Sequence, residues 1–463
     1  MNRRLLAALI ILWMFLLPLS ALSTDELVAR MEANNLELKK ARQDWQTALL
    51  DVKDAKAGRG PTVDMTVSGT YMYNPPVGPV YVSTQDLLQQ LSEQNVDVSL
   101  LEGQPDAYLK LYGGMEHTLY TFSLNITQPV FTWGKITDSI ELYQKAADVR
   151  SLQITALERK QKSELASRRE AVFYLLQMQK LVKEERENAS RLAEIAMSAR
   201  DNGLLLDVDV LKVKIQVQQI DVGLKQLEKE LSDQLLAVQN LCGDVSLKLD
   251  DIVSTPDDSV AESLLAMGQD ELVARSTSGA IDNLAILLRL RQVSEIAKKI
   301  ASASVNWKPD FALQTSVGYG GSRFPFVEED WYRQDDYTLN FTVAVKSTIW
   351  DGGKKLRDVT RGQAKVESSD VDYSQAVQKI RNEVVTQYLQ MQLDGDRIAY
   401  QDLVVESDKQ EWDQKRSLQE SGYGSEMDTL KAKLQWQTDS LEKLKLLLDR
   451  NSASHALSYL MGK

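Results

Sequence analysis

The chain of 463 residues contains a single cysteine, Cys242, and only two histidines, His117 and His455. A lone cysteine excludes an intrachain disulfide, even in an oxidising compartment. Neither histidine has a cluster of cysteine, histidine or paired carboxylates around it in the sequence, as a zinc site or a catalytic centre would require. We therefore expect no enzyme activity, no metal and no cofactor.

Proline is also scarce, with ten residues in the whole chain, and this leaves room for very long uninterrupted helices. Beyond residue 23 no apolar run is long enough to form a transmembrane helix. Acidic residues exceed basic ones and give a formal net charge of -12. A chain of this charge is a poor candidate for binding nucleic acid.

The N-terminal residues 1–23 have the pattern of a secretory signal peptide. Arg3 and Arg4 precede an apolar run over residues 5–17, and Ala21-Leu22-Ser23 fits a small-residue cleavage site. The run is short for a membrane anchor. No cysteine stands directly after this run, as a lipoprotein would need. We predict an exported protein whose mature chain begins near Thr24.

The mature chain repeats itself. "SARDNGLLLDVDVLKVKIQVQQ" at 198–219 aligns with "SLQESGYGSEMDTLKAKLQWQT" at 417–438, and at the same offset 117–135 aligns with 336–354. "DELVAR" occurs at both 25–30 and 270–275. A colinear series of matches is not well explained by chance. We predict a first repeat over 24–242, a connecting segment over 243–268 and a second repeat over 269–463.

Each repeat is expected to contain a helix, two strands, a very long helix, a glycine turn and a shorter return helix. The expected strands are 61–74 and 117–131 in the first repeat, and 309–320 and 336–350 in the second. The long helices are expected from Lys135 to about Arg200 and from Lys354 to about Glu420, each about 100 Å. Single helices over 24–56 and 269–304 complete the two repeats, and a short helix is expected at "STQDLLQQLSEQ" in the longer loop 75–116.

The four strands alternate apolar and polar residues, as in Val63, Met65 and Val67 against Asp64 and Thr66. Such alternation fits either a half-buried soluble sheet or a membrane β-barrel, and the signal peptide and strand length favour the barrel. Four strands are too few to close a barrel, and an open sheet edge in lipid would leave backbone N–H and C=O groups without hydrogen-bond partners. Two chains would give eight strands filled by side chains, whereas three would give twelve and begin to leave a lumen.

The strand pairs ending in "PVFTWGK" and "TIWDGGK", the long helices, and the turns "NGLLLDVDVLKVK" and "SGYGSEMDTLKAK" together resemble the TolC family of outer-membrane efflux proteins. The resemblance implies a mixed α/β membrane protein that forms a homotrimer. Its chains would share a twelve-stranded β-barrel in outer-membrane lipid and a helical tunnel with a large periplasmic portion. It also implies a periplasmic adaptor (membrane fusion) protein and an inner-membrane transporter of RND, ABC or MFS type as partners. The implied function is a passive duct of a tripartite efflux or type I secretion system.

The resemblance also suggests sites, although the match to the family's motifs is partial. Asn202 and Gly203-Leu204 stand at the Val-Gly-Leu-like tip motif, and Lys431 replaces the second of two gate aspartates. The adaptor-docking tips would be Gly203, Leu204, Leu205, Gly422 and Tyr423, the tunnel gate Asp209, Asp428, Lys212 and Lys431, and the strand–helix junctions Gly134 and Gly353. The aspartate–lysine pairs could equally be ordinary surface ion pairs. The alternative function is a surface-located coiled-coil structural or adhesive protein.

Overall fold

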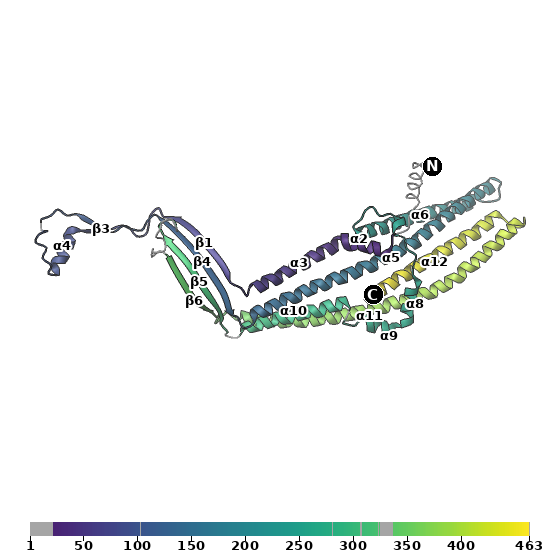
Figure 1. The fold of residues 1–463 in the computed structure, drawn as a ribbon. Helices are drawn as coiled ribbons and strands as arrows, with labels where there is room; N and C mark the ends of the chain where they lie inside the picture. The colour runs from purple at the N-terminus through teal and green to yellow at the C-terminus, as the bar shows by residue number, and fades with distance from the viewer. Residues whose placement is uncertain are drawn as a thin grey trace, which may run out of the picture. The chain divides into compact units, whose positions relative to one another are not determined.

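The computed structural model describes residues 22–101, 103–279, 281–305, 308–322, 324 and 337–462, so most of the expected signal peptide lies outside the described residues. The first-half elements are α2 (Thr24–Asn34), α3 (Leu36–Ala57), β1 (Thr62–Tyr71), β2 (Val80–Ser83), α4 (Thr84–Glu93), β3 (Tyr108–Tyr112), β4 (Thr118–Phe131), α5 (Lys135–Asp201) and α6 (Asp207–Cys242). The remaining elements are α7 (Leu249–Ile252), α8 (Asp258–Met267), α9 (Gln269–Ser276), α10 (Asp282–Val305), β5 (Asp310–Gly321), β6 (Tyr337–Lys346), α11 (Lys354–Glu420) and α12 (Glu426–Leu460). The order helix, strand, strand, long helix, return helix therefore occurs twice (Figure 1).

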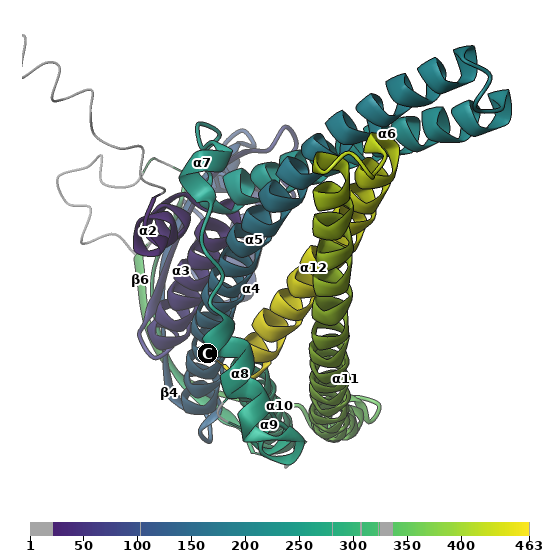
Figure 2. The same cartoon turned by 90° about the vertical axis from the view of Figure 1, so that its right-hand side faces the viewer.

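Two compact units make up the chain. The first comprises residues 1–50, 143–295 and 363–463, and the second comprises 51–142 and 296–362. The first is helical and contains the two hairpins α5–α6 and α11–α12 (Figure 2). Both long helices have 67 residues, against 36 and 35 in the return helices. Among the described residues, no helix combines the length and apolarity needed to cross a membrane.

The second unit contains an antiparallel four-stranded sheet in the order β1-β4-β5-β6. Strands β1 and β4 come from the first repeat and β5 and β6 from the second, so the central β4–β5 pairing joins the two repeats. The strands begin and end close to the expected positions, except that β6 ends at Lys346 rather than at residue 350. There the chain turns into α11, and the Asp351 carboxylate accepts from the backbone N–H groups of Gly353 and Lys355.

Two similar hydrophobic cores lie in the helical unit. The first joins α2, α5 and α6 through Leu27, Met31, Leu165, Val172, Met178, Leu231 and Val238. The second joins the five helices α8, α9, α10, α11 and α12 through Leu264, Leu272, Leu284, Val384, Met391 and Leu457. The repeated "DELVAR" supplies one fully buried leucine to each core, Leu27 and Leu272. Each such side chain contributes about 2 kcal/mol of burial free energy.

The two flanking helices were expected to be continuous, and this was wrong. The predicted helix 24–56 is broken at Asn35, whose buried side chain donates to the Leu241 carbonyl and accepts from the Leu38 N–H. Asn35 thus caps the start of α3 while it ties the break to α6. The predicted helix 269–304 is broken between Ser276 and Asp282, at the "TSG" of Thr277, Ser278 and Gly279.

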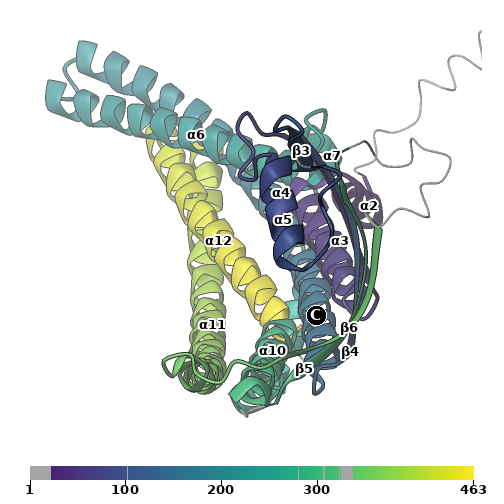
Figure 3. The same ribbon diagram turned by 90° about the vertical axis from the view of Figure 1, so that its left-hand side faces the viewer.

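The longer first-half loop has a structure of its own (Figure 3). The expected short helix is present as α4, capped by Ser83, whose hydroxyl accepts from the N–H groups of Gln85 and Asp86. The antiparallel β2–β3 pair was not expected from the sequence. The ends of this segment meet, because the Met115 N–H donates to the Val77 carbonyl at 2.9 Å.

Candidate functional site

The sheet has one strongly apolar face. Its register places apolar side chains opposite each other in rows that cross the strands, such as Met65–Leu124–Val317–Leu339 and Val67–Phe122–Tyr319–Tyr337. The edge-strand members of this face stay open to solvent within a single chain: Met65 is 66% exposed and Phe341 is 72% exposed. Contiguous exposed apolar surface of this kind marks a lipid or protein contact.

The opposite face of the same sheet is polar. The neighbouring rows read Asp64–Asn125–Ser316–Asn340 and Thr66–Ser123–Gly318–Thr338. The Ser68 and Thr121 hydroxyls hydrogen-bond across the strands at 2.7 Å. A sheet with one apolar and one polar face suits a boundary between lipid and water.

Both edges of this sheet are unpaired among the described residues, because β1 and β6 each have one neighbour. The two edge strands have the same length, ten residues each. An exposed strand edge is a template for pairing with another chain.

The predicted strand–helix junction residues lie where a strand gives way to a long helix. Gly134 (φ +83°) directly precedes α5, and Gly353 (φ +79°) directly precedes α11. At the first junction the Trp133 indole donates to the Pro309 carbonyl at 2.9 Å, and Lys135 pairs with Asp310 at 2.9 Å. These contacts join the end of β4 to the start of β5, and sequence reasoning did not identify them.

The first helical tip contains the glycine expected there. Gly203 has φ +73°, a conformation that residues with L side chains rarely adopt. The Gly203 N–H donates to the Arg200 carbonyl and the Leu204 N–H donates to the Ala199 carbonyl, and these two hydrogen bonds cap the end of α5. Leu204 is 77% exposed, whereas Leu205 is half-buried. One of the two predicted docking leucines is therefore fully available to a partner.

The second tip repeats this geometry. Gly422 has φ +78°, and Tyr423 beside it is 88% exposed. Ser425 then caps α12 by accepting from the Met427 N–H. Each tip thus presents one large exposed apolar side chain directly after its glycine.

The predicted gate residues lie just past these tips. Asp209 and Lys212 form an ion pair at 3.2 Å on the surface of α6. The equivalent residues of the second repeat, Asp428 and Lys431, are both exposed. Within the described residues they do not form an ion pair with each other. The Arg191–Glu426 ion pair at 3.0 Å, which joins α5 to the start of α12, was not predicted from the sequence.

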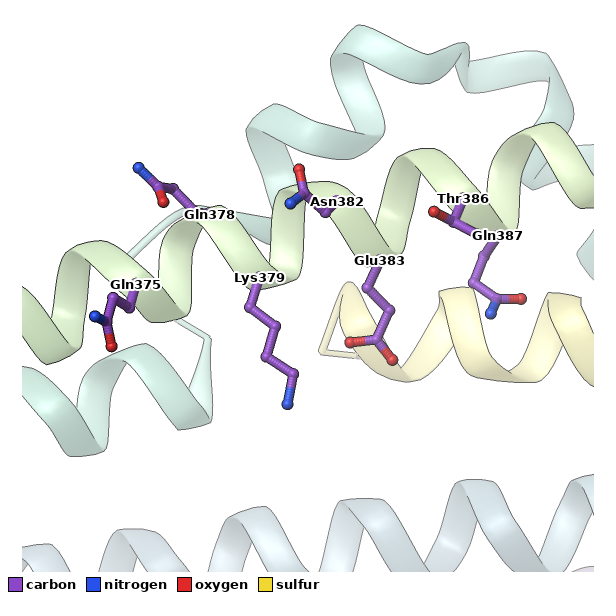
Figure 4. A pocket seen from close by; sticks show the side chains of 7 residues that line it. All are labelled: Gln375, Gln378, Lys379, Asn382, Glu383, Thr386 and Gln387. Atoms are coloured by element: carbon purple, nitrogen blue, oxygen red, sulfur yellow. The ribbon is translucent and has the colours of Figure 1, made fainter.

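Concave surfaces offer little to a small ligand. Figure 4 shows one lined by seven polar residues of α11 alone: Gln375, Gln378, Lys379, Asn382, Glu383, Thr386 and Gln387. They recur at helical spacing and form a polar stripe rather than an enclosed cavity. Within the described parts of the chain, no group of three or more His, Cys, Asp or Glu residues could hold a metal ion.

Comparison with known proteins decides the family. A family model described as outer membrane efflux protein matches residues 27–244 and 289–463, most of the chain. The chain belongs to the outer membrane efflux protein family. The two matched segments correspond to the two repeats, and membership places the protein in the outer membrane. No curated protein matches the sequence.

Solved structures agree with this efflux-family fold. A structure of CusC, described in terms of transmembrane channel formation, superposes with a TM-score of 0.70 at 14% identity, covering 95% of this chain and 91% of that one. The Vibrio cholerae outer membrane protein VceC gives 0.68 at 15% identity, covering 95% and 96%. The Campylobacter jejuni CmeC outer membrane channel gives 0.67 at 13% identity, covering 95% and 85%. Identities this low establish the fold alone, and the fold class predicted from the sequence is confirmed.

Proposed function

We propose that this efflux-family chain is one third of a passive export duct in the outer membrane, fed by an inner-membrane transporter through a periplasmic adaptor. The observation that carries the proposal is the four-stranded sheet with one apolar face, one polar face and two open edges. Pairing β1 of one chain with β6 of the next removes every edge. Three chains then give twelve strands, with the apolar face toward lipid and the polar face toward water.

The helical unit supports the same assembly. Helix α5 contacts α12 within the chain, where Asn188 donates to Gln437 and the clustered apolar side chains include Val182 and Leu434. Helices α6 and α11 keep exposed apolar side chains at helical spacing: Val208, Leu211, Ile215 and Val222 on α6, and Leu389, Leu393, Tyr400 and Leu403 on α11. In a ring of three chains these two stripes would be covered by neighbouring copies.

The partners of the duct follow from the tips. Leu204 and Tyr423 are exposed apolar residues at the ends of rigid hairpins, which suits docking of an adaptor's helical hairpin. Gly203, Leu205 and Gly422 would hold the shape of this docking surface. A transporter of RND, ABC or MFS type would supply the cargo, in drug or metal efflux or in type I secretion. The polar stripe on α11 in Figure 4 is a suitable water-facing wall for the duct.

The lipid-facing assignment is tested by a pair of adjacent substitutions. Phe341→Lys places a charge on the apolar face, which costs about 2–4 kcal/mol at the middle of a bilayer. Asn340→Lys places the same charge on the polar face and serves as the matched control. We expect wild type and Asn340→Lys to give a trimer by native mass measurement of detergent-solubilised outer membranes, and Phe341→Lys to lose most of it. A stable monomer or dimer in the wild type, or a soluble or surface-attached rod, would instead favour the structural coiled-coil alternative.

The β2–α4–β3 segment is expected to be dispensable for assembly. Because barrels place long loops on the outer side, this segment should project outside the cell. Joining Val77 to Met115 through two glycines removes it, and the hydrogen bond between these residues shows that the ends meet. We expect the shortened chain to form trimers in wild-type yield, measured by the same native mass method. Loss of trimers would place the segment within the assembly interface.

A further inference from the structure

Two aspartates face each other across the α11–α12 hairpin near its tip. The Trp412 and Trp436 rings stack with centroids 5.2 Å apart, and farther from the tip Asp402 pairs with Lys443. Between these two contacts the antiparallel register brings the Asp408 carboxyl group within hydrogen-bonding reach of the Asp439 carboxyl group. A carboxylate has no hydrogen to donate, so a hydrogen bond between these two groups requires one shared proton.

The surroundings assign that proton to Asp408. Asp439 already accepts two amide hydrogen bonds, from Gln401 at 3.2 Å and from Gln435 at 2.5 Å, which suit a carboxylate. The Asp408 Oδ2 atom is buried and has no hydrogen-bond partner within the described chain. Burial, followed by the hydrogen bond and charge of Asp439, raises the pKa of Asp408 to about 6.

A third carboxyl group lies against the neighbouring residue of α12. Glu185 of α5 is 7% exposed and lies 3.2 Å from the Thr438 hydroxyl, one residue from Asp439. Burial raises the pKa of Glu185 as well. Charged groups also surround these carboxyls. On α11 and α12 they are Glu411, the ion pair Asp402–Lys443, and Lys433, which donates to the Asn188 amide oxygen. On α5 and α6 they are the ion pair Arg186–Asp221.

We propose that Asp408 and Asp439 form a proton-held latch, in which one shared proton keeps α11 packed on α12 near the tip and its loss at neutral pH loosens this contact. Loss of the proton leaves two carboxylates facing each other in a half-buried site, where they repel. The consequence for transport rests on the proposed function: in a duct whose closed end lies at the tips, acid would hold that end shut.

The direction of the effect follows from linkage. A carboxyl group whose pKa is higher in the folded hairpin than in the unfolded chain binds its proton more tightly when folded. The stabilisation is therefore complete below the ordinary aspartate value of 3.8 and is lost as the pH rises through about 6. Glu185 changes in the same direction, because its pKa is also raised.

Local hydrogen exchange tests the latch in the full-length, detergent-solubilised protein. Peptides covering 400–415 and 430–443 would be compared at pH 5 and pH 7.5 after correction for intrinsic exchange rates. We expect protection in the wild type to fall about tenfold between the two pH values. This is the factor for one pH unit, the difference between pH 5 and the Asp408 pKa of about 6. Asp408→Asn is neutral at both pH values and its amide can donate to Asp439, so its protection should stay constant.

The matched control is Asp396→Asn, an exposed aspartate on the same helix, which should keep the wild-type pH dependence. Asp439→Asn is a second variant that removes the facing charge and should weaken the response, because burial alone still raises the pKa of Asp408. Wild-type protection that does not change between the two pH values would overturn the latch, as would an Asp408→Asn variant that keeps the wild-type fall. Exchange reports the hairpin itself, whereas failure of the proposed duct would appear as loss of trimers, so the two failures are distinguishable.

Discussion

Replacing Arg169 with alanine should destabilise the helical unit by about 2–3 kcal/mol, because it removes two charge-assisted hydrogen bonds and leaves the buried Ile252 carbonyl without a partner. Arg169 is 4% exposed in the middle of α5. In the mature chain its guanidinium donates to the Ile252 carbonyl at 3.0 Å and to the Thr24 hydroxyl at 2.6 Å. It therefore ties α5 to the start of α2 and to the end of α7. Burial lowers the pKa of Arg169, yet the group stays charged at neutral pH.

The adjacent arginine provides the control. Arg168 is half-exposed and bonds Glu164 one turn away and Gln234 on α6, so Arg168→Ala should cost under about 1 kcal/mol. Arg169→Met retains most of the side-chain volume and should be nearly as destabilised as the alanine variant. The measurement is chemical unfolding of the purified protein followed by far-UV circular dichroism. Equal midpoints for the Arg168 and Arg169 variants would contradict this role for Arg169.

Arg169 illustrates what a sequence pattern reveals and what it leaves out. Leu165, Arg169 and Val172 lie at i, i+4 and i+7, so the helical period indicates that this arginine faces the core. Its acceptors lie 145 residues before it at Thr24 and 83 residues after it at Ile252, and no periodicity relates such positions. The helical spacing of apolar residues predicted the long helices. The hydrogen bonds between segments far apart in the sequence could be identified only from the structure.

The broken helices illustrate a different limit. Asn34-Asn35 and the "TSG" at 277–279 carry residues that favour helix ends, so a signal was present. The apolar residues nevertheless continue at helical spacing across both breaks, so the period alone indicated unbroken helices. The β2 and β3 strands were missed because about two dozen residues and a helix separate them, so no short turn marks them as a hairpin.

Each hairpin tip is followed by an acidic side chain that is a candidate for the gate of the duct. Asp209 and Asp428 lie six residues beyond Gly203 and Gly422, at equivalent positions of the two repeats. In the proposed trimer they would supply six carboxylates to the narrow end of the duct. Like charges brought together repel, so the closed end needs counter-charges or bonds between hairpins. Lys212, paired with Asp209 at 3.2 Å, and the Arg191–Glu426 pair, which joins α5 to α12, are suited to this role.

The double variant Asp209→Ala with Asp428→Ala should raise single-channel conductance in a planar bilayer and weaken block by multivalent cations. Removing Asp209 frees Lys212 from its ion pair, and removing both carboxylates abolishes the ring of negative charge that attracts cations. The trimer should persist, because the half-buried Asp209 and the exposed Asp428 both lie outside the strand edges and the buried seams. The matched control is Asp413→Ala with Glu420→Ala, which removes the half-buried and the exposed acidic partner of Arg416 on α11 and should leave cation block unchanged. Unchanged conductance and cation block in a correctly assembled Asp209/Asp428 variant would show that these aspartates are only solvated helix residues.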